Sequence, residues 1–341
     1  MTEPVKRINL ALQGGGAHGA FTWGVLDRLF EDGRLAVDGI SGTSAGAMNA
    51  AVVAYGLARD GNEGARAALR EFWTRVAAAA RFSPIKPSPL DRWLSLGNMD
   101  FSPAWLAFDA LSRVMSPYEL NPLNYNPLER VLTSVVDFAW LADQCAHERV
   151  RLFLCATNVK TSKIKVFMGE EISAAAVLAS ACLPFLYQAV EIEGEAYWDG
   201  GYMGNPPIFP LIYHTDCADV LLVQINPMNI DEVPKRATEI FDRVNEVSFN
   251  SSLMRELRTI AFVTRLIDEG RLDAARYKRL NMHAIEAEDE LEPFTVSSKL
   301  NADPAFLDWL FELGRQRAGT WLEAHFEQIG QESTLDLEAF L

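Results

Sequence analysis

Short runs of consecutive apolar residues alternate with amphipathic stretches along much of the chain, which predicts buried parallel strands connected by helices. The predicted strands cover residues 8–12, 38–42, 151–156, 164–168 and 218–225. Helical patterns cover residues 21–30, 48–55, 62–80, 239–269 and 304–327. This alternation predicts an α/β fold, a three-layer αβα sandwich in which helices cover both faces of a mostly parallel sheet. Sites in such folds lie at the carboxyl ends of the strands.

The pattern changes at residues 82–127, where seven prolines are interleaved with aromatic and aliphatic residues. This stretch is too apolar for a disordered linker and predicts an inserted cap of short helices. Two interpretations stay open. The cap fills a local core, or it forms a lid and pocket wall over a site, in which we single out Trp93, Phe101 and Trp105.

The domain division follows from these patterns. We expect an α/β domain over residues 1–230, with the cap inserted at about 82–127. Residues 231–341 are expected to form a helical C-terminal extension packed on the core, and a homodimer face on these helices is the alternative.

Composition and charge limit the kinds of partner and cofactor that this protein is expected to bind. The 341 residues carry a formal charge of −15, which argues against nucleic acid and against electrostatic adhesion to anionic membranes. The four scattered cysteines are expected to be reduced, and no Cys/His cluster has metal-ligand spacing, so we expect neither metal nor cofactor. The N-terminus runs directly into the first strand and no apolar run is long enough to span a membrane, so a cytoplasmic location is expected.

Ser44 is the leading nucleophile candidate. It lies in a G-x-S-x-G pentapeptide between Gly42 and Gly46, after a predicted strand and before a predicted helix. The glycines remove side chains where a sharp strand-to-helix turn crowds its neighbours. A serine at the start of a helix also meets backbone N–H groups that favour a developing oxyanion.

A glycine-rich loop follows the first strand and offers two interpretations. Gly14, Gly16 and Gly19 fit the G-x-G-x-x-G dinucleotide pattern, but Asp38, at the spacing of a ribose partner, opens the next strand instead of closing it. Alternatively, the bare amides of Gly14, Gly15 and Gly16 form an oxyanion hole beside Ser44. The second interpretation uses both glycine motifs together.

The serine needs a base, and no histidine has a suitable context. The five histidines are His18, His147, His214, His283 and His325. Asp199 is the alternative, because it follows a short aromatic strand and precedes Gly200 and Gly201. Burial among Tyr197, Trp198 and Tyr202 would raise its basicity.

Taken in order, the glycine loop at 14–19, the Ser44 pentapeptide and Asp199-Gly200-Gly201 resemble the patatin-like phospholipase family. The resemblance covers roughly the first two-thirds of the chain, and residues 155–158, 174–184 and 205–207 also agree with it. It implies lipid acyl hydrolysis by a Ser–Asp dyad, with Ser44 as nucleophile, Asp199 as general base and Gly14, Gly15 and Gly16 as the oxyanion loop. His18 departs from the family, which usually has Lys or Arg there.

The resemblance implies a phospholipase A-like hydrolase whose acyl-enzyme forms on Ser44. A carboxylesterase or an intracellular polyhydroxyalkanoate depolymerase using the same dyad is the alternative, and a nucleotide-binding protein is the alternative of a different class. The apolar cap suggests transient contact with a membrane or another lipid surface. The acidic composition and His18 favour neutral esters over anionic headgroups.

Overall fold

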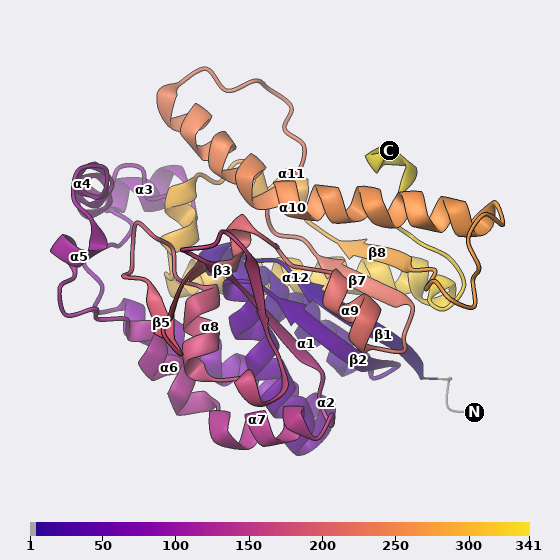
Figure 1. Cartoon of the computed structure of the whole chain (residues 1–341). Helices are drawn as coiled ribbons and strands as arrows, with labels where there is room; N and C mark the ends of the chain where they lie inside the picture. The colour runs from indigo at the N-terminus through magenta and orange to yellow at the C-terminus, as the bar shows by residue number, and fades with distance from the viewer. Residues whose placement is uncertain (1–4) are drawn as a thin grey trace.

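The structure is a computed structural model that describes residues 5–341, so residues 1–4, which precede the first strand, lie outside it (Figure 1). The described residues form an eight-stranded sheet in the order β5-β6-β3-β2-β1-β7-β8, with β4 paired to β3. Its strands are β1 (Lys6–Leu12), β2 (Leu35–Gly42), β3 (Leu152–Asn158), β4 (Ile164–Phe167), β5 (Val190–Ile192), β6 (Glu195–Asp199), β7 (Asp219–Val223) and β8 (Asn281–Ile285).

Strands β3, β2, β1, β7 and β8 are parallel, which confirms the expected α/β fold. Two details differ from the sequence pattern. Strand β4 was grouped with the parallel core, but it pairs antiparallel with β3. Strand β8 was not indicated at all, and it brings the C-terminal part of the chain into the sheet beside β7.

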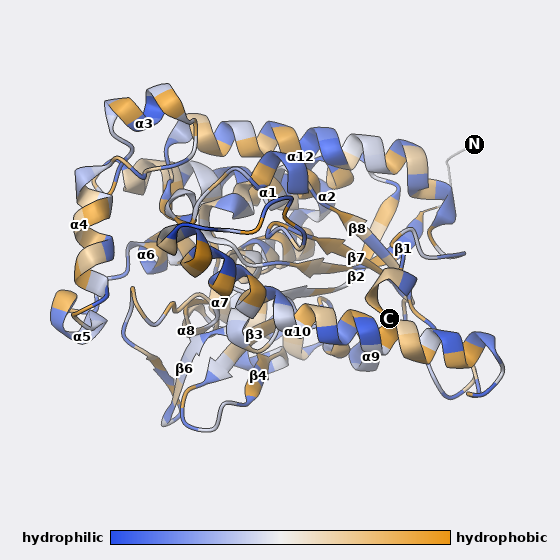
Figure 2. Cartoon of the chain, turned by 90° about the horizontal axis from the view of Figure 1, so that it is seen from above, coloured by the Kyte–Doolittle hydropathy of each residue, from blue (hydrophilic) through white to orange (hydrophobic). Residues whose placement is uncertain are grey.

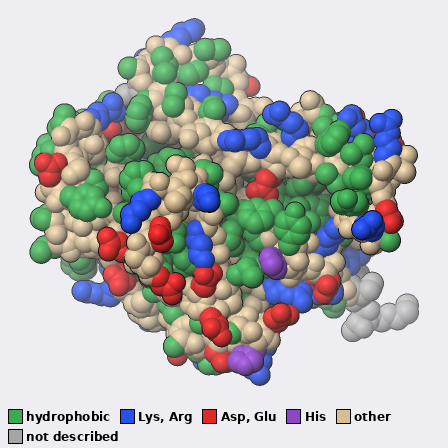
Figure 3. Space-filling view, viewed as in Figure 1, with side chains coloured by type: hydrophobic (Ala, Val, Ile, Leu, Met, Phe, Trp, Pro, Cys, Tyr) green, Lys and Arg blue, Asp and Glu red, His purple; other side chains and the backbone are tan. Residues whose placement is uncertain are grey.

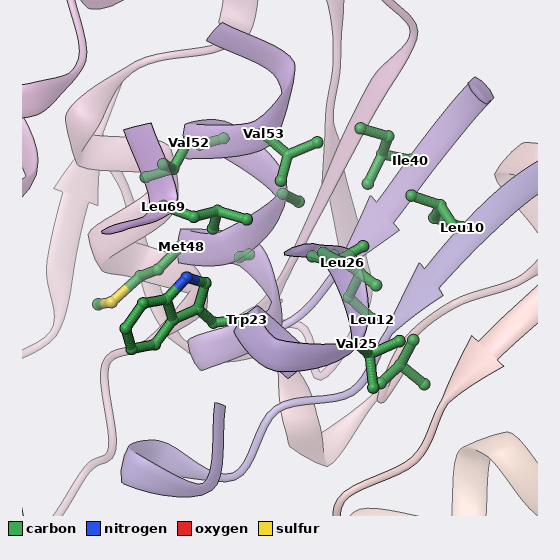
Figure 4. Close-up of a cluster of buried hydrophobic side chains, with 14 of the residues drawn as sticks. Leu10, Leu12, Trp23, Val25, Leu26, Ile40, Met48, Val52, Val53 and Leu69 are labelled. Carbon is green, nitrogen blue, oxygen red and sulfur yellow. The ribbon is translucent and has the colours of Figure 1, made fainter. Parts of the chain in front are cut away.

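Helices cover both faces of this sheet, which Figure 2 shows from above. One face is covered by α1 (Gly19–Asp32), α2 (Ala45–Ala80) and α12 (Pro304–His325), and the other by α9 (Phe209–His214) and α10 (Ala237–Asp268). Side chains of β7 alternate between two cores, because Leu221 and Val223 join the first and Val220 and Leu222 the second. Figure 4 shows the first core, where α1 and α2 pack against β1 and β2.

The cap consists of α3 (Pro89–Leu94), α4 (Pro103–Ser112) and α5 (Pro117–Leu120). Each helix begins with a serine at the N-cap followed by proline at the first helical position, a pair that starts helices efficiently. This local chemistry explains much of the proline content. The cap is fastened to the C-terminal part of the chain, since the amide of Met99 donates to Ser297 Oγ (2.8 Å) and Asn301 Nδ2 donates to Gly97 O (2.8 Å).

The other helices complete the layers and edges. They are α6 (Pro127–Val135), α7 (Phe138–Ala146), α8 (Ala174–Ser180) and α11 (Glu288–Leu291), with short 3-10 turns η1 (Gly16–His18), η2 (Gly169–Glu171), η3 (Gly200–Tyr202), η4 (Val296–Leu300), η5 (Phe326–Gln328) and η6 (Glu338–Phe340). Helix α2 is broken at Asp60 and Gly61, whose dihedral angles are not helical. Within residues 5–341, none of the helices combines the length and apolar character needed to cross a membrane.

Candidate active site

Ser44 occupies a strained turn between β2 and α2. Its φ of 56° and ψ of −122° are unusual for a residue with a side chain, and it directly precedes the first turn of α2. Three hydrogen bonds that involve side chains hold the turn and the end of β2: the Thr43 hydroxyl donates to Gly204 O (2.6 Å), the Ser41 hydroxyl donates to Pro207 O (2.6 Å), and the Ser44 amide donates to Ser180 Oγ (3.0 Å). Such strain at a serine, fixed from several sides, is typical of a nucleophile elbow.

The two glycines of the pentapeptide lie where no side chain fits. A Cβ on Gly42 would meet the carbonyl of Gly46 at 2.5 Å, and one on Gly46 would overlap the carbonyl of Leu12. Gly46 therefore lets the first turn of α2 lie directly against the end of β1. This contact brings the helix N-terminus, the elbow and the glycine loop together.

The register of β3 brings Asp199 to the elbow. Gly42, at the end of β2, pairs with Leu154, whereas Asp199, at the end of β6, pairs with Ala156. Strand β4 occupies the other edge of β3 over these same residues, so β2 and β6 share one edge. They run toward each other along it, because β2 is parallel and β6 antiparallel to β3. Asp199 is the last residue of β6, and Ser44 follows the last residue of β2 by two positions.

Asp199 is fully buried, and burial raises its pKa from the ordinary 3.8 to about 7. The Gly201 amide, which donates to Oδ1 at 2.8 Å, and the Ser44 hydroxyl both lower this pKa, but burial outweighs them. Oδ2 has no partner of full hydrogen-bond geometry among the described residues, although the Ser44 hydroxyl is near enough to affect the pKa. The ionised form of a carboxyl group with a pKa near 7 can take a proton from a hydroxyl near neutral pH.

The surroundings of Asp199 differ in part from those expected. Tyr197 is buried, and Trp198 and Tyr202 are half-buried. Burial raises the pKa of the Cys155 and Cys182 thiols, and the nearby charge of Asp199 raises it further. Gly200 and Gly201 form the turn η3 beneath the carboxyl. A Cβ on Gly200 would overlap the Cys155 carbonyl, and one on Gly201 would overlap the Phe249 ring.

The glycine loop lies against the elbow. A Cβ on Gly14 would approach Ser44 Cβ to 2.6 Å. The amide of Gly14 already donates to Asn205 Oδ1 (2.7 Å), and its carbonyl accepts from Asn226 Nδ2 (2.6 Å). The amides of Gly15 and Gly16 donate no hydrogen bond to any described residue. These two amides are the ones left for an oxyanion.

Sequence reasoning missed the side chains that support this loop. Asn205 fell inside a stretch that agreed with the family, but its role was not identified, and Asn226 and Ser180 were read as strand-end and helix residues. Their roles come from contacts across 136 to 212 positions of the chain. The Asn205-Pro206 and Asn226-Pro227 pairs were the signals available.

The histidines do not join the site as bases. Burial, and after it the charge of Lys299, lowers the pKa of His18 to about 3, and its Nε2 shares a hydrogen bond with Ser298 Oγ (2.8 Å). His283 pairs with Asp219 (3.1 Å) and His325 with Gln328 (2.6 Å). His147 contacts Asp143 in α7, and His214 stacks on Phe153.

Asp38 is unsuited to the ribose role of the dinucleotide interpretation. Its carboxyl contacts Arg7 and accepts from the amides of Asp216 (3.0 Å) and Cys217 (2.8 Å). It therefore ties together the entry ends of β1, β2 and β7, whereas the glycine loop follows the carboxyl end of β1.

The cap residues singled out from the sequence do not line a closed wall. Trp93 is 80% exposed and Phe101 is mainly exposed, while Trp105 is half-buried and packs against Phe108 with ring centres 6.1 Å apart. No contact that the structure records among residues 5–341 joins them to Ser44. The lid role stays a prediction.

Two solved structures are among those similar to this chain. The chain covers 67% of VipD from Legionella pneumophila and 52% of ExoU in the ExoU–SpcU complex from the type III secretion system of Pseudomonas aeruginosa. For VipD the identity is 16%, the TM-score 0.45 and the coverage of this chain 94%; for ExoU they are 17%, 0.38 and 95%. No curated protein sequence matches the chain.

The sequence model described as Patatin-like phospholipase matches residues 10–212, more than half of the chain. The matched range begins in β1 and includes the glycine loop, the elbow and Asp199, which are the residues that the resemblance rested on. The chain therefore belongs to the patatin-like phospholipase family, whose members are lipid ester hydrolases.

Proposed function

We propose that this protein is a lipid acyl hydrolase in which Ser44 is the nucleophile and Asp199 the general base. Ser44 Oγ attacks the carbonyl carbon of an ester while its proton passes to Asp199. The tetrahedral intermediate expels the alcohol, which takes that proton from Asp199, and an acyl-enzyme remains on Ser44. A water molecule then attacks the acyl carbon through the same proton transfers, which releases the fatty acid and restores both residues.

The observation that carries the proposal is the meeting of a strained serine and a desolvated carboxyl at one edge of β3. A carboxylate with an ordinary pKa near 4 is a weak base for a hydroxyl. With the pKa of Asp199 raised to about 7, the carboxylate is both populated and basic at neutral pH.

The oxyanion would be stabilised by the amides of Gly15 and Gly16 and by the N-terminus of α2. Gly14, which we also expected to donate, has its amide bonded to Asn205 and instead fixes the loop. Removal of one such donor typically costs about 10²–10³ in rate.

The substrate class within carboxylic esters is argued from the surface. Exposed hydrophobic side chains gather over the cap and over the N-terminal half of α10, at the left and top of Figure 3. We propose that these surfaces meet a lipid surface or an apolar polyester, which favours long-chain esters over small soluble ones. A phospholipid, a glyceride and a storage polyester all meet this description.

The assignment of the dyad is tested with an active-site label and a chromogenic ester. Wild type should react with a fluorophosphonate at Ser44, and Ser44→Ala should lose the label. Asp199→Asn should keep the fold and lose several orders of magnitude in turnover of a p-nitrophenyl ester, on the order of the losses seen when a catalytic base is removed. In wild type, kcat/KM should rise with pH to half its maximum near 7, because the base acts when ionised.

Two outcomes would contradict the proposal. Labelling that persists in Ser44→Ala places the nucleophile elsewhere. Near-normal turnover by Asp199→Asn removes the general base.

A further inference from the structure

A positive charge from a distant part of the chain lies beside the glycine loop. Lys299 lies in η4, outside the residues that match the family, and its ammonium donates to Asn226 Oδ1 (2.8 Å). The Lys299 backbone also touches the loop, because a Cβ on Gly16 would overlap the Lys299 carbonyl. Position 18, where family members usually carry a cation, holds a histidine that burial keeps neutral by lowering its pKa to about 3.

Asn226 connects this charge to the loop. Its Oδ1 accepts from Lys299, and its Nδ2 donates to Gly14 O at 2.6 Å. The Gln13 side chain fixes the backbone of Asn226, since Gln13 Oε1 accepts from the Asn226 backbone N–H at 2.8 Å. The carboxamide is therefore held with its acceptor toward the ammonium and its donor toward the loop.

The Gly14 carbonyl and the Gly15 amide belong to one peptide unit. In a trans peptide the N–H points away from the C=O, so Gly15 N–H points away from Asn226. A hydrogen bond to the carbonyl draws electron density from the nitrogen and makes the N–H a stronger donor. Gly15 is one of the two loop amides without a partner among the described residues.

Resting on the proposed function, we propose that Lys299, Asn226 and the Gly14–Gly15 peptide form a hydrogen-bond relay that strengthens the Gly15 N–H for the oxyanion. The ammonium polarises the Asn226 carboxamide, the carboxamide polarises the peptide, and the peptide N–H meets the negative charge that develops in the transition state. Lys299 is thus a positioning residue that acts through Asn226.

The surroundings of Lys299 suit this role. Burial lowers the pKa of its ammonium, while the charges of Glu246 and Asp242 on α10 act in the opposite direction. Neither carboxylate forms a close ion pair with it among the described residues, so the recorded hydrogen bond of the ammonium is directed at the carboxamide. A charge in a poorly solvated place acts more strongly on a neighbouring dipole than a charge in water does.

The relay is tested on a neutral p-nitrophenyl ester, which has no phosphate for Lys299 to contact. Lys299→Met should lower kcat on the order of tenfold and leave KM within about twofold, because the relay acts on the transition state. Asn226→Ala should lower kcat further. The double variant should be no slower than Asn226→Ala, since the charge acts only through that side chain.

Lys278→Met is the matched control. The Lys278 ammonium is also partly buried and donates to backbone carbonyls, Thr215 O at 2.6 Å and Leu211 O at 3.3 Å, near the entry end of β7. Its kcat should equal that of wild type. Melting temperatures are measured for all variants, and Lys299→Gln replaces Lys299→Met if the latter does not fold.

Additive losses in the double variant, or an unchanged kcat in Lys299→Met, would overturn the relay. So would a phospholipid KM that rises in Lys299→Met while the neutral ester is hydrolysed normally, because this pattern means direct contact with a headgroup. If wild type is not labelled at Ser44, the proposed function itself fails; if it is labelled and the losses add, only the relay fails.

Discussion

Burial of Asp199 makes its carboxylate a better base, but an ionised carboxylate at this position destabilises the fold. Its folded-state pKa of about 7 lies above the ordinary 3.8, so folding favours the protonated carboxyl. The stability that comes from this preference is fully present below pH 4 and is lost as pH rises through 7. Above that pH the fold carries a buried carboxylate whose second oxygen has no well-formed partner among the described residues.

Asp199→Asn should therefore stabilise the protein in a pH-dependent way. Relative to wild type, its free energy of unfolding should increase by about 2 kcal/mol between pH 5.5 and 8.5, with most of the change below pH 7, because each pKa unit corresponds to about 1.4 kcal/mol. Urea unfolding of both proteins across this range measures the difference. A difference that does not vary with pH would show that Asp199 keeps an ordinary pKa.

At the scale of elements, the contact between α2 and the end of β1 depends on Gly46. Replacing Gly46 by alanine should push the helix away from the carbonyls of Leu12 and Gln13, since a Cβ has no room there. We expect a loss of at least about 2 kcal/mol in the free energy of unfolding, near the upper part of the usual range for overpacking, together with loss of Ser44 labelling.

Gly319→Ala is the matched control for this change. Gly319 is also helical, in α12, but a Cβ there would meet only the Arg28 side chain at 3.7 Å. This variant should gain about 0.5–1 kcal/mol from the better helix propensity of alanine. Equal effects of the two substitutions in urea unfolding would mean that the close contact at Gly46 does not matter.

The sequence predicted the strands whose residues are mostly apolar. Strands β3 and β7 are buried along their whole length, and β1 is buried over residues 8–12, so these segments stand out as mainly apolar runs. Strand β8 did not, because it contains Asn281 and His283, both of which hydrogen-bond Asp219 of β7. These hydrogen bonds join residues that are 62 and 64 positions apart in the chain. A local sequence pattern contains no information about such distant partners.

The residues of the candidate site also fall into those that the sequence could predict and those that it could not. Ser44, Asp199 and the loop glycines were recognisable because each lies in a short motif with local turn chemistry. Asn205, Asn226 and Lys299 were not, since an asparagine or lysine has no meaning in the sequence until the fold brings a carbonyl or an amide to it. The division into a 1–230 domain and a 231–341 extension remains a proposal, and β8 and Lys299 make the two parts depend on each other.

For the whole molecule, the distribution of exposed apolar side chains predicts how it meets lipid. Leu123 in the cap is 90% exposed. The exposed large apolar residues in the N-terminal half of α10 include Ile240, Phe241, Val244 and Val247. Arg113, at the end of α4, lies 5.1 Å from the Phe241 ring of α10, so cap and helix form one continuous face. With a net charge of −15, this face should favour zwitterionic or neutral lipid over anionic lipid.

Vesicle flotation tests this surface. Wild type should float with phosphatidylcholine vesicles, and Leu123→Glu with Val244→Glu should reduce the bound fraction about tenfold or more, because two buried charges oppose insertion. Phe262→Glu, on the other half of α10, is the control and should bind normally. Hydrolysis of a soluble short-chain ester should be the same in all three proteins. Unaltered flotation of the double variant, or binding only to anionic vesicles, would argue against this face.

The shared edge of β3 has a consequence for how this protein tolerates change. Leu154 and Ala156 are two positions apart, so pairing with β3 sets the distance between the ends of β2 and β6. Main-chain hydrogen bonds set this distance. Side chains elsewhere in the sheet can therefore be substituted without separating Ser44 from Asp199. Inserting or deleting one residue between Leu154 and Ala156 would put the two strand ends out of step, and no side-chain substitution would bring them back.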